Sequence, residues 1–233
     1  RDVERSRGLG DVYKRQVLLI DMDGQANLTE SCGLSIEEER TVYGAMKGEY
    51  TLPVFELENG LSVVPSCLDL SATESELINE PGRELILKGL IAKLLETRKF
   101  DYILIDCPPS LGIVTTNAFI AADEIIVPMT PELLPLKGMR MLDAFVTTLQ
   151  RVKPSLRLGG VFIARFNHRK LNKVVEQAVK ERYESITMNT RIRENIALAE
   201  SAGSGKSIFE YDLNSNGAKD YLALTEEILS RNQ

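Results

Sequence analysis

Cysteine and histidine are scarce in this sequence. Its 233 residues include three cysteines, Cys32, Cys67 and Cys107, and a single histidine, His168. The cysteines lack the spacing of metal ligands and leave one thiol over in any disulfide scheme, which favours a reducing cytoplasm. Nothing near His168 suggests a nucleophile that needs a histidine as its base, so we expect His168 to be a surface residue.

Long apolar segments and an excess of positive charge are missing as well. No apolar run approaches the length of a membrane-spanning helix, and no charged-then-apolar secretory signal opens the sequence, so we expect no membrane partner. The net charge of −6 argues against a protein that binds nucleic acid over its whole surface. Any DNA contact must therefore come from a local patch of lysine and arginine.

The first sixteen residues differ from the rest of the sequence. Residues 1–16 are polar, without periodicity and crowded with arginine, and they change abruptly into the apolar run VLLID. We therefore expect residues 1–16 to be a non-native or disordered leader that replaces a true N-terminus. Residues 17–233 contain no repeat or linker and are long enough for a large core, which predicts a single domain.

Apolar runs and helical periodicities alternate along residues 17–233. The apolar runs predict buried parallel strands, at Val17–Met22, Leu61–Pro65, Tyr102–Ile105, Glu124–Val127 and Leu158–Ala164. The helical periodicities predict helices, at Arg83–Arg98, Asn117–Ala122, Pro131–Val152, Lys170–Tyr183 and Ser215–Arg231. The mixed stretch Ser35–Leu57 predicts short helices and a loop. This alternation predicts an α/β fold with a doubly wound, mostly parallel sheet and helices on both faces.

Two of the predicted strands end on aspartate. VLLID leads into Asp21 and Asp23, and FDYILID ends on Asp106. In an open parallel sheet, the carboxyl ends of neighbouring strands meet at the edge where ligands bind. Acids at this edge typically hold Mg²⁺ and a reactive water beside a nucleotide phosphate. Alternate residues of a strand share a face, so Asp21 and Asp23 can point towards one site. The alternative is that these acids merely end the strands at solvent.

These motifs carry a resemblance to a known family. VLLIDMDGQANLT, FDYILIDCPPSLG and the C-terminal block that starts at Glu194 resemble the deviant Walker A ATPases of the ParA/Soj family, over essentially everything from Val17 onwards. The resemblance implies that Asp23 positions the attacking water and contributes to a Mg²⁺ site. It implies that Asp106 is the Walker B acid, which holds Mg²⁺ through a water. The family usually has proline where this sequence has Gly24, and we expect glycine to keep the turn but loosen it.

The same resemblance implies a cellular role. Members of the family segregate plasmids and chromosomes. Their ATP-bound homodimer binds DNA non-specifically and is reset when a ParB-like DNA-binding protein stimulates hydrolysis. We therefore expect a cytoplasmic, nucleoid-associated ATPase with ATP and Mg²⁺ as cofactors. We expect it to act in the partition of a plasmid, a chromosome or a mobile element.

The phosphate-binding loop of the family pattern is not found before Val17. Family members carry a KGGxGKT loop whose amides and lysine hold the phosphates. We expect this sequence to lack the first strand, the P-loop and the first helix of the P-loop NTPase fold, and therefore to hydrolyse little or no ATP. Gly203–Ser207 looks like the end of a P-loop, but the required earlier glycine falls at Glu200 and a helical stretch precedes it. We expect a turn there.

The base and DNA contacts are weaker predictions. Segments of the family that match Arg165–Arg169 lie beside the adenine, which makes Asn167 a candidate to read the base and Arg169 a candidate to bracket it. A strand-end turn with solvated charges is equally compatible with these residues. The family often has a proline–arginine pair where this sequence has Arg193 and Glu194, so the usual proline–adenine contact is in doubt.

The resemblance places the basic side chains that contact DNA phosphates in the C-terminal block. The candidates are Arg191, Arg193, Lys206 and Lys219, with Lys170 and Lys173 as weaker ones. Ordinary solvated charge, balanced by Glu194 and Glu200, is the competing interpretation.

Three other functions are compatible with parts of the sequence. A MinD-like membrane-cycling ATPase for cell division shares the motifs, but TEEILSRNQ has no cationic amphipathic face. A metabolic enzyme or iron–sulfur reductase of the same fold is disfavoured by the absence of cysteine pairs. A nucleotide-free scaffold is favoured only if the missing P-loop is genuine.

Overall fold

The computed structural model describes residues 15–131, 135–167 and 169–231. Residues 1–14 of the predicted leader, and His168, lie outside the described residues. The chain divides into two compact units. The first comprises the residues up to Ala122 together with Ser204–Glu210, and the second comprises Asp123–Gly203 and Tyr211–Gln233. The single domain over residues 17–233 stays a prediction.

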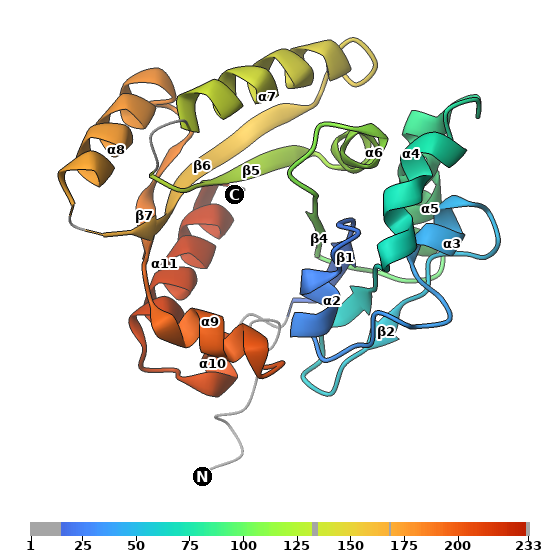
Figure 1. Cartoon of the computed structure of the whole chain (residues 1–233), viewed down its shortest axis with the longest axis horizontal. Helices are drawn as coiled ribbons and strands as arrows, with labels where there is room; N and C mark the ends of the chain where they lie inside the picture. The colour runs from blue at the N-terminus through green and yellow to red at the C-terminus, as the bar shows by residue number, and fades with distance from the viewer. Residues whose placement is uncertain (1–14, 132–134, 168, 232–233) are drawn as a thin grey trace. The chain divides into compact units, whose positions relative to one another are not determined.

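The first unit is built on a four-stranded sheet with the order β2-β3-β1-β4 (Figure 1). Its strands are β1 (Val17–Asp21), β2 (Phe55–Glu56), β3 (Ser62–Val64) and β4 (Tyr102–Asp106). β1 runs parallel to β3 and to β4, whereas β2 is antiparallel to β3. Leu18 and Ile20 of β1 are fully buried, as expected for a strand between two parallel neighbours.

Short helices connect the strands of the first unit. They are α2 (Asn27–Ser31), α3 (Val42–Met46), η2 (Leu68–Ala72), α4 (Thr73–Glu76), η3 (Arg83–Leu85), α5 (Ile86–Leu95), α6 (Ile113–Ala121) and most of α10 (Ile208–Tyr211). The helix predicted at Arg83–Arg98 is divided into η3 and α5. The buried Asn117 ties this junction to α6, because its Oδ1 accepts from Leu87 N (3.0 Å) and its Nδ2 donates to Arg83 O (2.8 Å).

The second unit has a parallel sheet with the order β5-β6-β7. Its strands are β5 (Glu124–Met129), β6 (Arg157–Phe166) and β7 (Thr187–Arg193), and its helices are α7 (Pro135–Leu149), α8 (Lys170–Arg182), α9 (Ile196–Gly203) and α11 (Asn216–Arg231). β7 is missing from the predicted strands because its sequence, TMNTRIR, contains no continuous apolar run.

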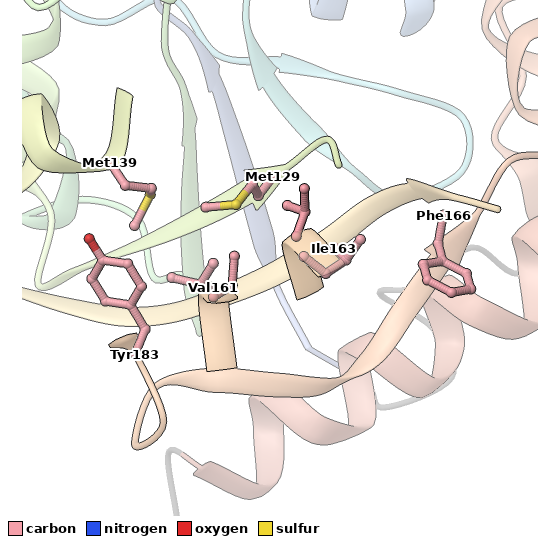
Figure 2. Packing of buried hydrophobic residues seen from close by; sticks show 8 residues of the cluster. Met129, Met139, Val161, Ile163, Phe166 and Tyr183 are labelled. Atoms are coloured by element: carbon pink, nitrogen blue, oxygen red, sulfur yellow. The ribbon is translucent and has the colours of Figure 1, made fainter. Parts of the chain in front are cut away.

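The side chains of β6 alternate between the two faces of this sheet. Val161 and Ile163 lie on the face that α7 and α8 cover, in a cluster with Met129, Met139, Phe166, Val175, Val179 and Tyr183 (Figure 2). Phe162 lies on the opposite face and packs with Leu224 of α11 and Leu198 of α9. Arg165 has a φ of +54°, which interrupts the alternation so that Phe166 joins the cluster with Val161.

The α/β, mostly parallel fold predicted from the sequence is therefore confirmed. Helices cover both faces of the second sheet, as the doubly wound pattern predicts. None of the described helices is long and apolar enough to cross a lipid bilayer.

Candidate functional site

The carboxyl ends of β1 and β4 bring together the aspartates that the sequence singles out. β1 and β4 are labelled in Figure 1, and the register of their pairing sets Asp21 beside Asp106. The backbone continues this pairing through a hydrogen bond of 2.9 Å from Met22 N to Asp106 O. Asp23 follows in the turn after β1. We call Asp21, Asp23 and Asp106 the acid edge.

Asp21 is fully buried and faces the protein. Its Oδ1 accepts a hydrogen bond from Asp23 N (3.0 Å), and its Oδ2 accepts from Thr29 N (2.9 Å) and Thr29 Oγ1 (2.7 Å). The expectation that Asp21 and Asp23 both point towards one ligand is therefore corrected. Asp21 holds the turn and the start of α2, because β1 ends at Asp21 and the strand alternation does not extend to Asp23.

Asp23 sits in a tight turn that leads into α2. Its Oδ1 accepts from Gln25 N (3.0 Å), and its backbone carbonyl accepts from Ala26 N (2.9 Å). Ala26 has a φ of +53°, a conformation that alanine seldom adopts. Within the described part of the chain, Asp23 Oδ2 receives no hydrogen bond, which leaves this oxygen available to a water or a metal ion.

Gly24 is closely covered by Ser71 of η2. A Cβ atom added to Gly24 would lie 2.3 Å from Ser71 Oγ and 3.2 Å from Ser71 N. The φ of Gly24 is not among the positive values, so the backbone itself does not require glycine here. The structure adds a steric reason for glycine at this position, and the expectation that glycine loosens the turn stays a prediction. Glycine lets η2 approach the residue that follows Asp23.

Like charges meet at Asp106. Burial of the carboxylate, and then the negative charges of Asp21 and Asp23, raise the pKa of Asp106, while the backbone N–H of Cys107 acts in the opposite direction. A carboxylate that is difficult to ionise beside two others is a site where a cation would be stabilised.

The donor set of the acid edge fits Mg²⁺ with incomplete protein ligation. In residues 15–131, 135–167 and 169–231, no three His, Cys, Asp or Glu side chains are grouped to hold a metal ion by themselves. Asp21 is fully buried and accepts three hydrogen bonds, so Asp23 and Asp106 are the two carboxylates that the edge offers. Mg²⁺ typically keeps several waters and takes one or two carboxylates together with substrate phosphates.

The cysteines near the acid edge are free thiols. Burial, and then the charges of Asp106 and Asp23, raise the pKa of Cys107 to about 12. Burial and the charge of Asp21 raise the pKa of Cys32 to about 11. Both side chains therefore stay protonated near neutral pH and are poor nucleophiles or metal ligands.

Comparison with known proteins decides the family. The family of AAA domains called AAA_31 matches residues 7–158. The chromosome-partitioning ATPase Soj of Treponema pallidum is 36% identical over 226 residues, which cover 93% of this chain and 86% of that protein. The chain belongs to the ParA/Soj family of P-loop ATPases. The chromosome partitioning protein ParA of Myxococcus xanthus is 34% identical over 229 residues, or 94% of this chain and 78% of that protein.

Solved structures of similar proteins contain nucleotides. Cobyrinic acid a,c-diamide synthase of Mycobacterium smegmatis, solved with ADP and magnesium, has a TM-score of 0.80 and 28% identity over 94% of this chain and 83% of that one. A Borrelia burgdorferi protein assigned to plasmid partition, bound to AMPPNP, has a TM-score of 0.81 and 25% identity over 94% and 88% of the two chains. The two differ in function, so the fold alone does not choose between a metabolic and a partition role.

Asn167 and Arg169, the ParA-like base candidates, lie between β6 and α8 of the second unit. Asn167 Nδ2 donates to Glu194 Oε2 (3.2 Å), and Asn167 Oδ1 accepts from Arg169 N (3.3 Å). Asn172 Nδ2 donates to Asn167 O (3.0 Å). The amide of Asn167 is therefore engaged inside the unit, and it must change partners to read a base. Its role as a base contact stays a prediction.

The arginines predicted to bind DNA are engaged in ion pairs on β7. Arg193 Nη2 lies 2.6 Å from Asp220 Oδ1 and Arg193 Nε lies 2.9 Å from Asp220 Oδ2, which joins β7 to α11. Arg191 Nη2 lies 2.5 Å from Glu176 Oε1 of α8, and its guanidinium carbon lies 4.9 Å from the centroid of Phe166. These contacts give both arginines a structural role, and their DNA role stays a prediction.

The two predicted lysines belong to different units, and Lys219 shares the second unit with Arg191 and Arg193. Lys219 lies on α11 of the second unit, whereas Lys206 belongs to the first unit. Lys206 follows Gly205, which has a φ of +64° in the turn between α9 and α10. The P-loop-like segment Gly203–Ser207 therefore follows a helix, as predicted, and does not have the strand-to-helix setting of a phosphate loop.

The structure adds residues that the sequence did not single out. Thr29 bonds Asp21, Ser71 covers Gly24, and Glu194 bonds Asn167. The contacts of Ser71 and Glu194 join residues far apart in the sequence and carry no periodic signal, whereas Thr29 is the last residue of the VLLIDMDGQANLT motif that contains Asp21. A hollow of about 440 Å³ in the first unit is lined by residues such as Tyr43, Tyr50 and Cys67 but by none of the predicted site residues.

Proposed function

We propose that this protein is a ParA-like ATPase that partitions a plasmid, a chromosome or a mobile element. In this proposal, an ATP-bound homodimer binds DNA without sequence preference on the nucleoid, in the cytoplasm, and a ParB-like partner stimulates hydrolysis. Membership of the ParA/Soj family supports it, as do the partition roles given to the Treponema pallidum and Myxococcus xanthus relatives. The observation that carries it is the pairing of Asp21 with Asp106, which sets Asp23 and Asp106 at one edge of the sheet.

In this proposal, Asp23 and Asp106 of the acid edge have different roles in phosphoryl transfer. Asp23 orients the attacking water through its carboxylate, whose Oδ2 is not occupied by a hydrogen bond within the described residues. Asp106 and Asp23 would hold Mg²⁺ at this edge, with Asp106 as the Walker B acid. Bound Mg²⁺ would neutralise charge that develops on the phosphate oxygens. Its charge would also relieve the repulsion that raises the pKa of Asp106.

The residues proposed for the base and for DNA act in ATP binding and in DNA binding, which precede hydrolysis. Asn167 would read the adenine after releasing Glu194, and Arg169 would bracket it. Lys206, Lys219, Arg191 and Arg193 would contact DNA phosphates. Among the described residues, neither lysine forms an ion pair, whereas the arginines must leave Asp220 and Glu176. We therefore expect the lysines to contribute more than the arginines.

The hydrolysis test compares two polypeptides. One is the chain of residues 1–233, and the other, which we call the extended chain, carries a P-loop strand, loop and helix of the family pattern directly before Val17. We expect little or no turnover from residues 1–233, because their sequence contains no KGGxGKT loop to hold the phosphates. We expect Mg²⁺-dependent turnover from the extended chain. Asp23→Ala should lower its kcat by about 10²–10⁴-fold, whereas Asp123→Asn, at an exposed site, should leave it unchanged.

Two results would contradict this assignment. Robust turnover by residues 1–233 that Asp23→Ala abolishes would contradict their inactivity. An extended chain that binds ATP but hydrolyses it equally well with and without Asp23 would contradict the role of Asp23.

The DNA and dimer proposals have separate tests. The ATP-bound extended chain should bind two unrelated duplexes with equal affinity, and the logarithm of the binding constant should fall linearly with the logarithm of the salt concentration. Lys219→Gln should reduce that slope by about one. Light scattering should show a doubled mass when ATP is added. Affinity that is indifferent to salt, or a mass that is indifferent to ATP, would contradict the respective proposal.

A further inference from the structure

The turn that carries Asp23 is held by a buried network on its inner side. Asp21 lies at the centre, fully buried, with hydrogen bonds from Asp23 N, Thr29 N and Thr29 Oγ1. Asp21 therefore joins the backbone of the catalytic candidate to the first turn of α2. An ionised carboxylate inside a protein is tolerated when hydrogen bonds compensate its desolvation, and this one has three such donors.

Asp21 also replaces the missing cap of α2. The N-cap residue of this helix is Ala26, which has no side-chain oxygen to accept a backbone N–H, and its φ is +53°. Asp21 Oδ2 takes the N–H of Thr29 instead. The carboxylate thus supplies from β1 what a serine or aspartate usually supplies from the N-cap position. Loss of Asp21 would free both the turn and the helix that follows it.

Thr29 extends the network to the neighbouring strand. Its hydroxyl donates to Asp21 Oδ2 and accepts from Ser66 N at 2.9 Å, just beyond the end of β3. Thr29 and Ser66 are both fully buried, so water is not available to replace this link. The Asp23 turn is in this way tied to β3 as well as to β4, whose Asp106 carbonyl accepts from Met22 N.

We propose that Asp21 and Thr29 are positioning residues that fix the Asp23 carboxylate relative to Asp106. They do not touch the nucleotide; they set the backbone from which Asp23 reaches the attacking water. This inference rests on the proposed function, because it assigns a reason for the placement of the proposed catalytic acid. A displacement of about 1 Å at a reacting group lowers a rate by about 10²-fold, so the network controls kcat without contributing a reacting atom.

The test uses three variants of Thr29 and Asp21 in the extended chain. Thr29→Val keeps the shape and removes the hydroxyl, whereas Thr29→Ser keeps the hydroxyl and removes the methyl group. Asp21→Asn places an amide where the Thr29 donors expect an acceptor. We expect Thr29→Val and Asp21→Asn to lower kcat by about 10²-fold while the KM for ATP stays close to that of the parent. Thr29→Ser should restore most of kcat.

A second measurement uses residues 1–233 and needs no turnover. Hydrogen exchange of the Asp23 and Ser66 amides should accelerate in Thr29→Val but not in Thr29→Ser, because only the hydroxyl connects them. The whole-chain melting temperature serves as the control for general destabilisation.

The possible failures are distinguishable. An unchanged kcat in Thr29→Val, or an equal loss in Thr29→Val and Thr29→Ser, overturns the positioning role while the activity of the parent still supports the proposed function. An inactive extended chain contradicts the proposed function and this inference together. A loss confined to KM overturns the inference as well, since it assigns the network to binding.

Discussion

The acid edge of the first unit and the arginines of the second unit differ in how far their charges are compensated. At the acid edge, Asp106 lies near two further aspartates, and its pKa is raised by burial and then by their charges. On β7, Arg193 and Arg191 are paired with Asp220 and Glu176. Uncompensated charge lowers the stability of the folded protein and therefore indicates a ligand site. Charge that is paired within the protein is explained by its contribution to the fold.

The comparison also separates two kinds of evidence about function. The acids were found from strand ends, and the fold brings them to one edge. The arginines were found from a family pattern, and the fold gives them partners of their own.

Arg191 should matter for folding more than Lys219 does. Among the described residues, Arg191→Met leaves Glu176, which is 7% exposed, with Lys180 as its one remaining ion-pair partner, at 3.0 Å. It also removes the cation above Phe166. We expect the free energy of unfolding in urea to fall by about 1–3 kcal/mol. The matched variant Lys219→Met should change it by less than about 0.5 kcal/mol. Equal stability of both variants would remove the structural explanation for Arg191.

Gly24 and Ser71 should behave as a coupled pair. Gly24→Ala places a methyl group 2.3 Å from Ser71 Oγ, and we expect it to lower the free energy of unfolding by about 1–2 kcal/mol. Ser71→Gly should cost little, because Ser71 is exposed. The double variant should recover part of the loss, with a coupling energy of about 0.5–1 kcal/mol. Strictly additive effects would show that η2 does not press on the Asp23 turn.

Stability should respond to acid in opposite directions at the two regions. Burial alone raises the pKa of Asp220, but the hydrogen bonds and charge of Arg193 outweigh it and leave the pKa lowered. The stability that Asp220 contributes is therefore present above its unfolded value near 3.8 and is lost as the pH falls through the folded value. The raised pKa of Asp106 has the opposite sign, because the folded state takes up a proton before the unfolded state does as the pH falls.

Charge removal at neutral pH tests this difference without a pH scan. Without Mg²⁺ and nucleotide, Asp106→Asn should raise the free energy of unfolding and Asp220→Asn should lower it. Each change should stay within about 1 kcal/mol, because solvent screens charges near the surface. Urea titrations at pH 7 measure both variants. Changes of the same sign would contradict the contrast between the two regions.

The sequence was sufficient for the strands that bury apolar runs. VLLID and YILID became β1 and β4, and their parallel pairing follows from the α/β pattern, so Asp21 and Asp106 were expected at one edge. β7 was missed because its apolar residues are interrupted by polar ones such as Asn189 and Arg191. β7 also contacts α8 and α11, and no local sequence pattern predicts these contacts.

The division of roles inside the acid edge was also beyond the sequence. Asp21 and Asp23 have the same side chain and lie two positions apart. Only the fold shows that Asp21 is buried and bonded to Thr29, while Asp23 lies partly exposed in the turn after β1. The partners of Arg191 and Arg193 lie on helices far away in the sequence, so the structural role of these arginines could not be derived from their spacing.

The most direct test of the account asks whether Asp23 and Asp106 share one divalent cation. Mn²⁺ would be added with a non-hydrolysable ATP analogue to the extended chain, and the NMR signals of its aspartates would be followed. We predict strong paramagnetic broadening of both Asp23 and Asp106 and a weaker effect on the exposed Asp101, which lies before the opposite end of β4 in the same unit. Broadening of only one of the two carboxylates, or of neither while the nucleotide is bound, would contradict a shared metal site at this edge of the sheet.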